Sequence, residues 1–153
     1  MERFLWSKLN SLQVGRFSEY FVKMEFAMYG FQVYTSEVDD RGIDLVIRYE
    51  QGSFYTVQVK SLRDFGYVFM PKSKFPLHNH LYLAFGLLFD GKEPDLFLIP
   101  SQVWLTPDSV FVDREFKGLK SPPEWGINIS RRNMPRLKEY LFSDTIEKIM
   151  AQG

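Results

Sequence analysis

Two strand-like runs around a short turn constrain this chain more than any other feature. Residues 43–49 and 54–61 both read as strands, the second with alternating apolar and polar side chains from Tyr55 to Lys60, and residues 50–52 (Glu-Gln-Gly) separate them. A three-residue loop that ends in glycine is typical of a type I turn followed by one left-handed residue. We therefore expect a β-hairpin in which Gly52 is left-handed and Tyr49 faces Ser53.

This register places three polar side chains together at the end of the hairpin away from the turn. Asp44 lies opposite Gln58, and directly opposed residues point to the same face of a sheet. Lys60 shares that face because side chains alternate along a strand. The other face of the second strand is apolar and carries Tyr55, Val57 and Val59.

An acid, an amide and an amine at one point suit a hard divalent cation. Mg²⁺ prefers oxygen ligands and keeps several waters, so one or two carboxylates with carbonyl oxygens suffice. Such a cation polarises a phosphoryl oxygen and lowers the pKa of a bound water. A neighbouring ammonium can offset the charge that develops on the phosphate. The chain has no cysteine, which excludes a thiolate-based metal site.

The other patterns predict one α/β domain over residues 1–153, with a mixed central β-sheet flanked by helices. An N-terminal helix is expected over residues 14–29, with an apolar arc formed by Phe17, Tyr20, Phe21, Met24, Ala27 and Met28. Further strands are expected at 31–35, 67–70, 81–89, 96–99, 110–112 and 127–129, and a short helical turn at 100–104.

The C-terminal part is expected to be helical over about 133–150. Asn133 is a candidate cap for a helix over residues 134–142. Asp144 and Glu147 resemble a capping box that opens a last helix, which ends near Met150.

Four short motifs follow one another along the first part of the chain. They are Gly15-x-x-x-Glu19 on a helix, Gly30-Phe31 entering a strand, Gly42-Ile43-Asp44, and Gln58-Val59-Lys60. In order and spacing they resemble the PD-(D/E)XK nuclease superfamily, closest to archaeal Holliday-junction resolvases and Mrr-type restriction nucleases. The match covers about residues 14–61. Leu98-Ile99-Pro100 and Trp104 resemble the continuation in small endonucleases of this group.

The resemblance implies a restriction-endonuclease-like core over about residues 14–104, with Mg²⁺, or Mn²⁺ in its place, as the cofactor. Asp44 would be the principal metal ligand and Glu19 the helix-borne acidic ligand. Gln58 would occupy the second acidic position, Val59 would offer its main-chain carbonyl, and Lys60 would be the catalytic lysine. The implied catalytic set is thus Lys60, Asp44, Gln58 and Glu19.

Two positions depart from the family pattern. Ile43 stands where the family name has proline, which is of little consequence. Gln58 stands where the family has an acid, so the site loses one negative charge and its metal affinity should fall. Asp39 or Asp40 are candidates to compensate.

The charges balance overall but are unevenly distributed. Lys and Arg number 19, as do Asp and Glu, which excludes a protein that coats nucleic acid by bulk charge. Residues 37–50 are mainly acidic, whereas 60–74 and 131–138 are mainly basic. Ordinary surface variation accounts equally well for each basic run alone. The candidate phosphate contacts are Arg63, Lys72, Lys74, Arg131, Arg132 and Arg136.

We therefore expect a metal-dependent endonuclease that hydrolyses phosphodiester bonds in branched or duplex DNA. A homodimer is compatible with cutting both strands. Two alternatives stay open: a nucleic-acid-binding or interaction module with the same fold that has lost activity, and an unrelated α/β domain whose Asp, Gln and Lys are structural. The longest apolar run, residues 81–89, is far shorter than the ~20 residues that span a bilayer. No signal-peptide pattern opens the chain, so a cytoplasmic protein without membrane contact is expected.

Overall fold

Two β-sheets contain the strands of the computed structural model, which describes residues 2–37, 42–116, 118 and 120–152. The larger sheet has the order β1-β2-β3-β5-β6 and the smaller one β4-β8-β7. Their bounds are β1 (Gln32–Thr35), β2 (Leu45–Arg48), β3 (Phe54–Arg63), β4 (Gly66–Pro71), β5 (Leu81–Leu88), β6 (Asp95–Pro100), β7 (Phe111–Arg114) and β8 (Glu124–Ile129).

Only β3 and β5 run parallel, and the other strand pairs are antiparallel. The α/β class and the mixed sheet are therefore confirmed. A second sheet was not expected from the sequence. The helices are α1 (Ser11–Met28), α2 (Met134–Leu137) and α3 (Phe142–Gln152), joined by the 3₁₀ turns η1 (Trp6–Lys8), η2 (Lys72–Lys74), η3 (Ser101–Leu105) and η4 (Lys138–Tyr140).

Strand β5 lies at the centre of the molecule, and all of its residues are buried. On one face, Leu83 and Phe85 pack in a cluster with residues of the smaller sheet. On the other face, Tyr82 and Ala84 pack in a cluster with residues of α1 and α3. A strand covered on both faces reads as a continuous apolar run, which is why residues 81–89 predicted it well.

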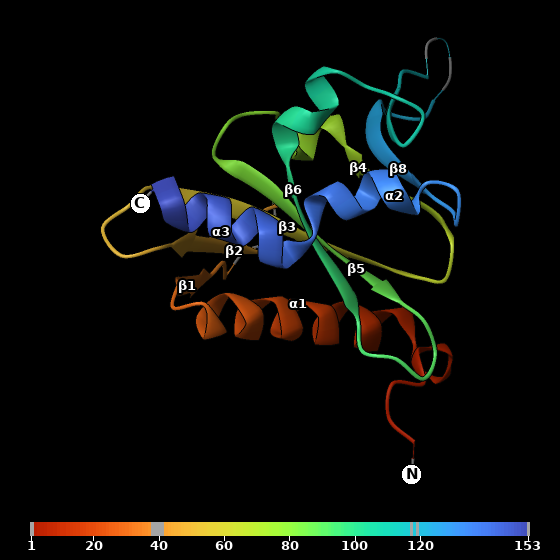
Figure 1. Ribbon diagram of the computed structural model, residues 1–153. Coiled ribbons are helices and arrows are strands. Elements are labelled where there is room, and N and C mark those ends of the chain that lie inside the picture. The colour runs from red at the N-terminus through yellow and green to blue at the C-terminus, as the bar shows by residue number, and fades with distance from the viewer. Residues whose placement is uncertain (1, 38–41, 117, 119, 153) are drawn as a thin grey trace.

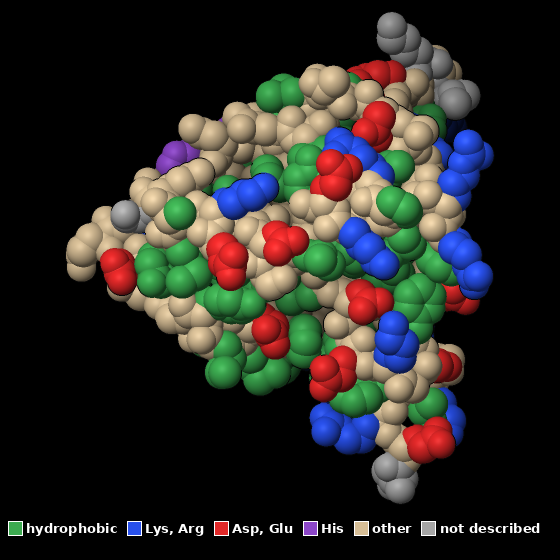
Figure 2. Space-filling model, viewed as in Figure 1, with side chains coloured by type: hydrophobic (Ala, Val, Ile, Leu, Met, Phe, Trp, Pro, Cys, Tyr) green, Lys and Arg blue, Asp and Glu red, His purple; other side chains and the backbone are tan. Residues whose placement is uncertain are grey.

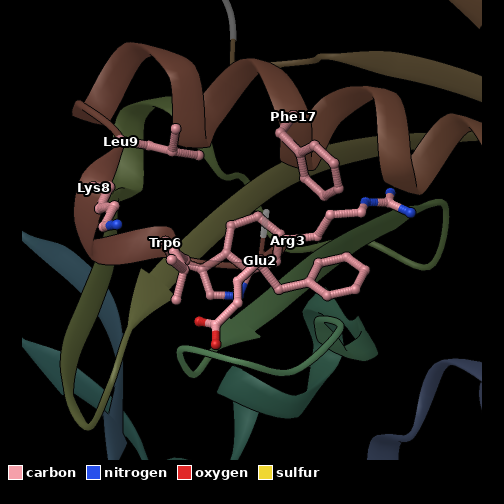
Figure 3. A pocket seen from close by; sticks show the side chains of 8 residues that line it. Glu2, Arg3, Trp6, Lys8, Leu9 and Phe17 are labelled. Atoms are coloured by element: carbon pink, nitrogen blue, oxygen red, sulfur yellow. The ribbon is translucent and has the colours of Figure 1, made fainter.

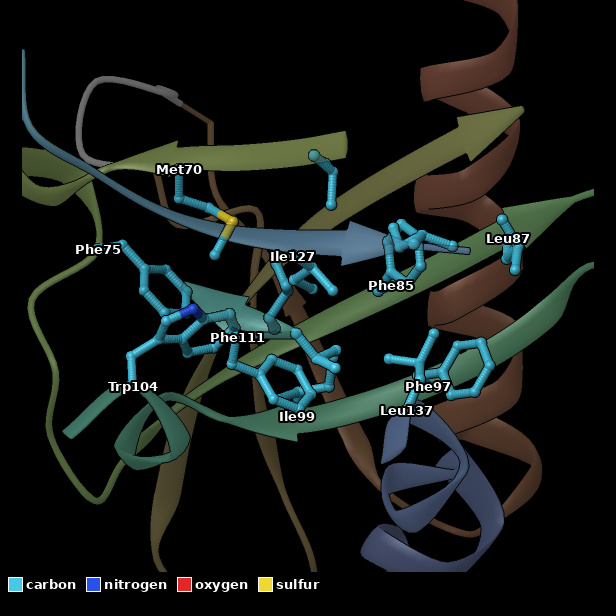
Figure 4. Packing of buried hydrophobic residues seen from close by; sticks show 14 of the residues in the cluster. Met70, Phe75, Phe85, Leu87, Phe97, Ile99, Trp104, Phe111, Ile127 and Leu137 are labelled. Carbon is cyan, nitrogen blue, oxygen red and sulfur yellow. The ribbon is translucent and has the colours of Figure 1, made fainter. Parts of the chain in front are cut away.

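The layers follow from these two clusters. Helix α1 packs beside β1 and β3, and α3 packs beside β6, while in Figure 1 β4 and β8 lie at the far end of the molecule from α1. Figure 4 shows the cluster between the two sheets, where Phe85 from the larger sheet approaches the smaller one and Phe97 lies beside Leu137 of α2. The facing residues of the smaller sheet are Met70, Phe111 and Ile127.

Helix α1 is confirmed, but the face that it buries was wrongly predicted. It begins at Ser11 because Asn10 and Gln13 form a capping box through two hydrogen bonds. Its buried residues are Val14, Ser18, Val22 and Phe26. The expected apolar arc points away from the sheet: Met28 is 82 % exposed, and Tyr20 and Met24 are 55 % exposed. The buried residues form an i, i+4 stripe that faces the strands.

The C-terminal helices also differ from the prediction. The side chain of Asn133 makes no cap; its amide donates to the Asn128 carbonyl at 2.9 Å. Helix α2 ends at Leu137, and α3 begins at Phe142, so Asp144 lies inside its first turn. The break follows from burial of Phe142, whose ring meets that of Phe26 on α1 at 4.9 Å.

Candidate active site

The β2–β3 hairpin has the predicted register. Leu45 lies opposite Val57, and Arg48 lies opposite Phe54. The turn differs in one detail, because its left-handed residue is Glu50 (φ 52°) rather than Gly52. The Gly52 N–H donates to the Tyr49 carbonyl at 2.9 Å, which closes a tight turn of the predicted length. Register depends on loop length, so the correct length was enough.

Asp44 sits where the ladder between β2 and β3 ends. Its N–H donates to the Val57 carbonyl at 3.0 Å, and its carboxylate oxygen Oδ2 accepts from the Val59 N–H at 2.7 Å. The carboxylate thus takes the position that a strand carbonyl would occupy. A strand residue directs its N–H and C=O toward the same side, so the Val59 carbonyl also points toward Asp44.

Gln58 is buried, with 6 % of its surface exposed. Its amide oxygen Oε1 is the one buried side-chain polar atom in the described part of the chain that lacks a hydrogen-bond partner. A buried acceptor without a partner is costly and calls for an explanation. The candidate explanations at this position are a cation or a water that the oxygen would bind.

Gly42 lies next to this oxygen, and the Lys74 carbonyl lies next to Gly42. A Cβ atom at Gly42 would lie 3.5 Å from Gln58 Oε1 and only 2.7 Å from the Lys74 carbonyl oxygen. Gly42 also has φ +75°, a conformation that other residues rarely adopt. Turn η2 therefore packs directly on the loop before Asp44, a contact that no local sequence pattern could have revealed.

Lys60 is half-buried and shares a face of β3 with Gln58. The alternation is fixed by Val57 and Val59, which pack in the cluster on the helical side. In the described residues, no hydrogen bond or ion pair engages the Lys60 ammonium. The hairpin thus brings Asp44, Gln58 and Lys60 to adjacent positions.

Glu19 lies on the other side of the sheet. Val22 of α1 packs in the same cluster as Val57, so α1 covers the face opposite to the one from which Gln58 and Lys60 project. Glu19 is partly exposed, and within the described ranges it makes no hydrogen bond or ion pair. The structure therefore does not group Glu19 with the hairpin residues.

The oxygens at the hairpin fit a hard cation with a single carboxylate. They come from Asp44, from the Gln58 amide and from the Val59 carbonyl, and all are of the type that Mg²⁺ binds. Among residues 2–37, 42–116 and 120–152, no three His, Asp or Glu side chains group to hold a metal ion. Asp39 and Asp40, the candidates for a further acidic ligand, lie outside the described residues.

Three of the six candidate phosphate contacts are already engaged within the protein. Lys72 forms ion pairs with Asp113 and Glu115, and its ammonium lies 4.0 Å from the centre of the Trp125 ring. Burial alone would lower the pKa of Lys72, but the hydrogen bonds to the two carboxylates outweigh it and raise the pKa above its usual value.

The other two engaged residues are Arg63 and Arg136. The Arg63 guanidinium donates to the main-chain carbonyls of Trp6 and Leu9, and Arg136 pairs with Asp108 and Glu139. Lys74, Arg131 and Arg132 are exposed, and no partner engages them in the described chain. On the face shown in Figure 2, basic and acidic side chains are interspersed.

A hollow of about 680 Å³ lies elsewhere, beside the N-terminal segment and α1 (Figure 3). It is lined by Glu2, Arg3, Phe4, Leu5, Trp6, Lys8, Leu9 and Phe17. No predicted site residue is among them. The described helices include none that is long and apolar enough to cross a membrane.

The sequence matches no known protein family and no curated protein. The likeness to PD-(D/E)XK nucleases thus rests on the four sequence motifs.

Proposed function

We propose that this protein is a metal-dependent nuclease that hydrolyses phosphodiester bonds in DNA. One observation carries the proposal. The register of the β2–β3 hairpin sets the Asp44 carboxylate on the Val59 N–H, next to the unpartnered Gln58 oxygen and the unengaged Lys60 ammonium. This combination of groups suits the recognition of a cation and a phosphate together.

In this proposal Asp44, Gln58 and the Val59 carbonyl hold Mg²⁺ or Mn²⁺. When bound, the metal would supply Lewis-acid chemistry at the phosphoryl oxygen and a nucleophilic water. Lys60 orients that water or offsets the negative charge that grows on the phosphate in the transition state. The proposal does not depend on Glu19, which α1 places beyond the opposite face of the sheet.

Cleavage assays test the proposal directly. Labelled linear duplex, four-way junction and single-stranded DNA are incubated with Mg²⁺, with Mn²⁺ or with EDTA. Asp44→Asn and Lys60→Ala should lower the rate by about 100-fold or more, because each removes charge stabilisation in the transition state. Lys148→Ala, an exposed lysine on α3, should cut like the wild type. Far-ultraviolet circular dichroism confirms that each variant folds.

A second function has one observation in its favour. Gln58 gives the site one carboxylate fewer than the family pattern, which suits a nucleic-acid-binding module without activity. Calorimetric titration with Mn²⁺ separates the two functions. If the protein is a nuclease, the wild type should bind Mn²⁺ and Asp44→Asn should bind it much more weakly. DNA binding without cleavage or metal binding would favour the module, and binding of neither ligand would reject both.

A further inference from the structure

The main-chain carbonyl of Lys74 lies beside the candidate active site. Its oxygen and the buried Gln58 Oε1 both lie within 3.5 Å of one point, the position that a Cβ atom at Gly42 would take. Among the described residues, no hydrogen-bond donor reaches the Lys74 carbonyl, and none reaches Gln58 Oε1. Two oxygens without a partner in the described chain thus border the same small space beside Gly42.

The turn η2, which carries Lys74, is fixed to the smaller sheet at both ends. At its start, the Lys72 N–H donates to the Pro123 carbonyl at 3.0 Å. Just past its end, the Phe75 carbonyl accepts from the indole Nε1–H of Trp125, a residue of β8, at 3.2 Å. Phe75 is fully buried, so η2 cannot rotate without disturbing the close-packed core. The Lys74 carbonyl is therefore held in a set position.

The side chain of Lys72 adds a third link between η2 and the smaller sheet. Its ammonium pairs with Asp113 of β7 and with Glu115, and it lies 4.0 Å from the centre of the Trp125 ring. Only 18 % of this side chain is exposed. Two carboxylates and an aromatic face satisfy the ammonium within the protein. Lys72 is thus placed to hold the turn, and with it the Lys74 carbonyl.

We propose that the Lys74 carbonyl is a further oxygen ligand of the divalent cation and that Lys72 positions it. The inference rests on the proposed function for the presence of that cation. Hard divalent cations bind oxygen, and main-chain carbonyls serve beside carboxylates. Gln58 stands where the family pattern has an acid, so Asp44 is the one charged ligand of the hairpin. A carbonyl from η2 adds a ligand without adding charge.

Substitution of Gly42 tests whether the carbonyl takes part. A Cβ atom there would lie 2.7 Å from the Lys74 oxygen, closer than two such atoms approach, so Gly42→Ala has to displace the turn. Gly91 supplies the matched control, because it is also left-handed (φ +84° against +75°) and a Cβ atom there would meet nothing within 4 Å. Both variants bear backbone strain, so both should melt below the wild type in EDTA. Only Gly42→Ala should weaken Mn²⁺ binding, by about ten-fold or more in calorimetric titration.

Lys72 tests the same ligand from the other side of the turn, away from the loop that carries Asp44. Lys72→Gln removes both ion pairs and should weaken Mn²⁺ binding about ten-fold, whereas Lys72→Arg should retain most of the affinity. Asp108→Asn breaks an ion pair that includes no residue of η2, and it should bind Mn²⁺ like the wild type. The double variant Gly42→Ala/Lys72→Gln should lose little more than the larger single loss, because both changes displace one carbonyl.

The outcomes separate this inference from the proposed function. Mn²⁺ binding that Asp44→Asn abolishes, but that Gly42→Ala and Lys72→Gln leave unchanged, would overturn the Lys74 ligand and leave the nuclease standing. Equal losses of affinity in Gly42→Ala and Gly91→Ala would trace the effect to backbone strain and would also overturn the ligand. The expected pattern of Mn²⁺ binding without cleavage of any DNA substrate would support the ligand and reject the nuclease. A wild type that binds no Mn²⁺ would overturn both.

Discussion

Gln58 is the residue at which stability and function should oppose each other. Its buried oxygen has no partner, and a buried unsatisfied polar group destabilises the fold by about 1–3 kcal/mol. Methionine has a similar shape and no such oxygen. We expect Gln58→Met to raise the free energy of unfolding by about 1 kcal/mol in urea titrations and to weaken metal binding.

Gln102, an exposed residue of η3, supplies the matched control. Gln102→Met should change the free energy of unfolding by no more than about 0.5 kcal/mol. A loss of stability in Gln58→Met would show that the amide makes a favourable interaction in solution, which would remove the reason to seek a cation there.

Gln58→Glu tests the same position by adding a carboxylate where Gln58→Met removes a polar oxygen. A second carboxylate beside Asp44 would be buried without a partner in EDTA, so the melting temperature should fall below that of the wild type. Millimolar Mg²⁺ should raise the melting temperature of Gln58→Glu more than that of the wild type, because ligand binding to the folded state stabilises it. Equal shifts in the two proteins would place the metal elsewhere.

For the candidate site residues, the sequence could predict which ones lie close together but not how deeply each is buried. The proximity of Asp44, Gln58 and Lys60 was predictable because loop length sets hairpin register, even though the left-handed residue is Glu50. The burial of Gln58 was not predictable, since Gly42 lies beside its oxygen and the Lys74 carbonyl, from a separate turn, lies beside Gly42. Contacts between distant segments leave no local pattern.

At the scale of elements, Asp108 joins β7 to α2. Its carboxylate accepts from the N–H groups of Val110 and Phe111, both at 2.8 Å, and from Arg136 at 3.0 Å. Burial would raise the pKa of Asp108, but the two N–H groups and the guanidinium outweigh it and hold the pKa below its usual value. The charged form is therefore favoured by folding.

The contribution of Asp108 to the free energy of unfolding should therefore depend on pH. A carboxylate whose folded-state pKa is depressed stabilises the fold above its unfolded pKa of about 3.9, and this stabilisation is lost as the pH falls through the folded value. Asp108→Asn should lower the free energy of unfolding by about 1 kcal/mol at neutral pH. The difference from the wild type should shrink below about pH 4.

Urea titrations at neutral and acidic pH measure this difference. Glu147→Gln, an exposed acid on α3, serves as the control and should match the wild type within about 0.5 kcal/mol at each pH. A difference for Asp108→Asn that stays constant into acid would mean that the charge of Asp108 contributes nothing.

A helix or strand was predictable in full where a single hydrophobic pattern fits its sequence. The buried strand β5 has a continuous apolar run, and a single interpretation fits it. Helix α1 has apolar side chains on two sides, so its periodicity fixed the helix but not the buried face. The exposed face carries Met24 and Met28, and the buried face carries Val22 and Phe26, so apolar content alone did not distinguish them.

The arrangement of the whole molecule was the least predictable level. Strands β4, β7 and β8 were expected, but nothing in their sequences indicated a separate sheet. That sheet packs its apolar side chains on the face of β5, a contact between segments that are distant in the sequence.

The balanced charge of the whole molecule predicts a shallow salt dependence for nucleic-acid binding. Among the candidate contacts, four cations have no hydrogen bond or ion pair within the described residues: Lys60, Lys74, Arg131 and Arg132. Each phosphate neutralised on a single strand contributes about −0.7 to the slope of log K against log salt, so the slope should be no steeper than about −3. Anisotropy titrations over a series of KCl concentrations measure it.

Two lysine variants sharpen this measurement. Lys74→Gln should reduce the magnitude of the slope by about 0.7, because it removes one phosphate contact. Lys72→Gln should leave the slope unchanged, since Asp113 and Glu115 already neutralise that ammonium. A wild-type slope steeper than about −5 would mean that the internal ion pairs open on binding.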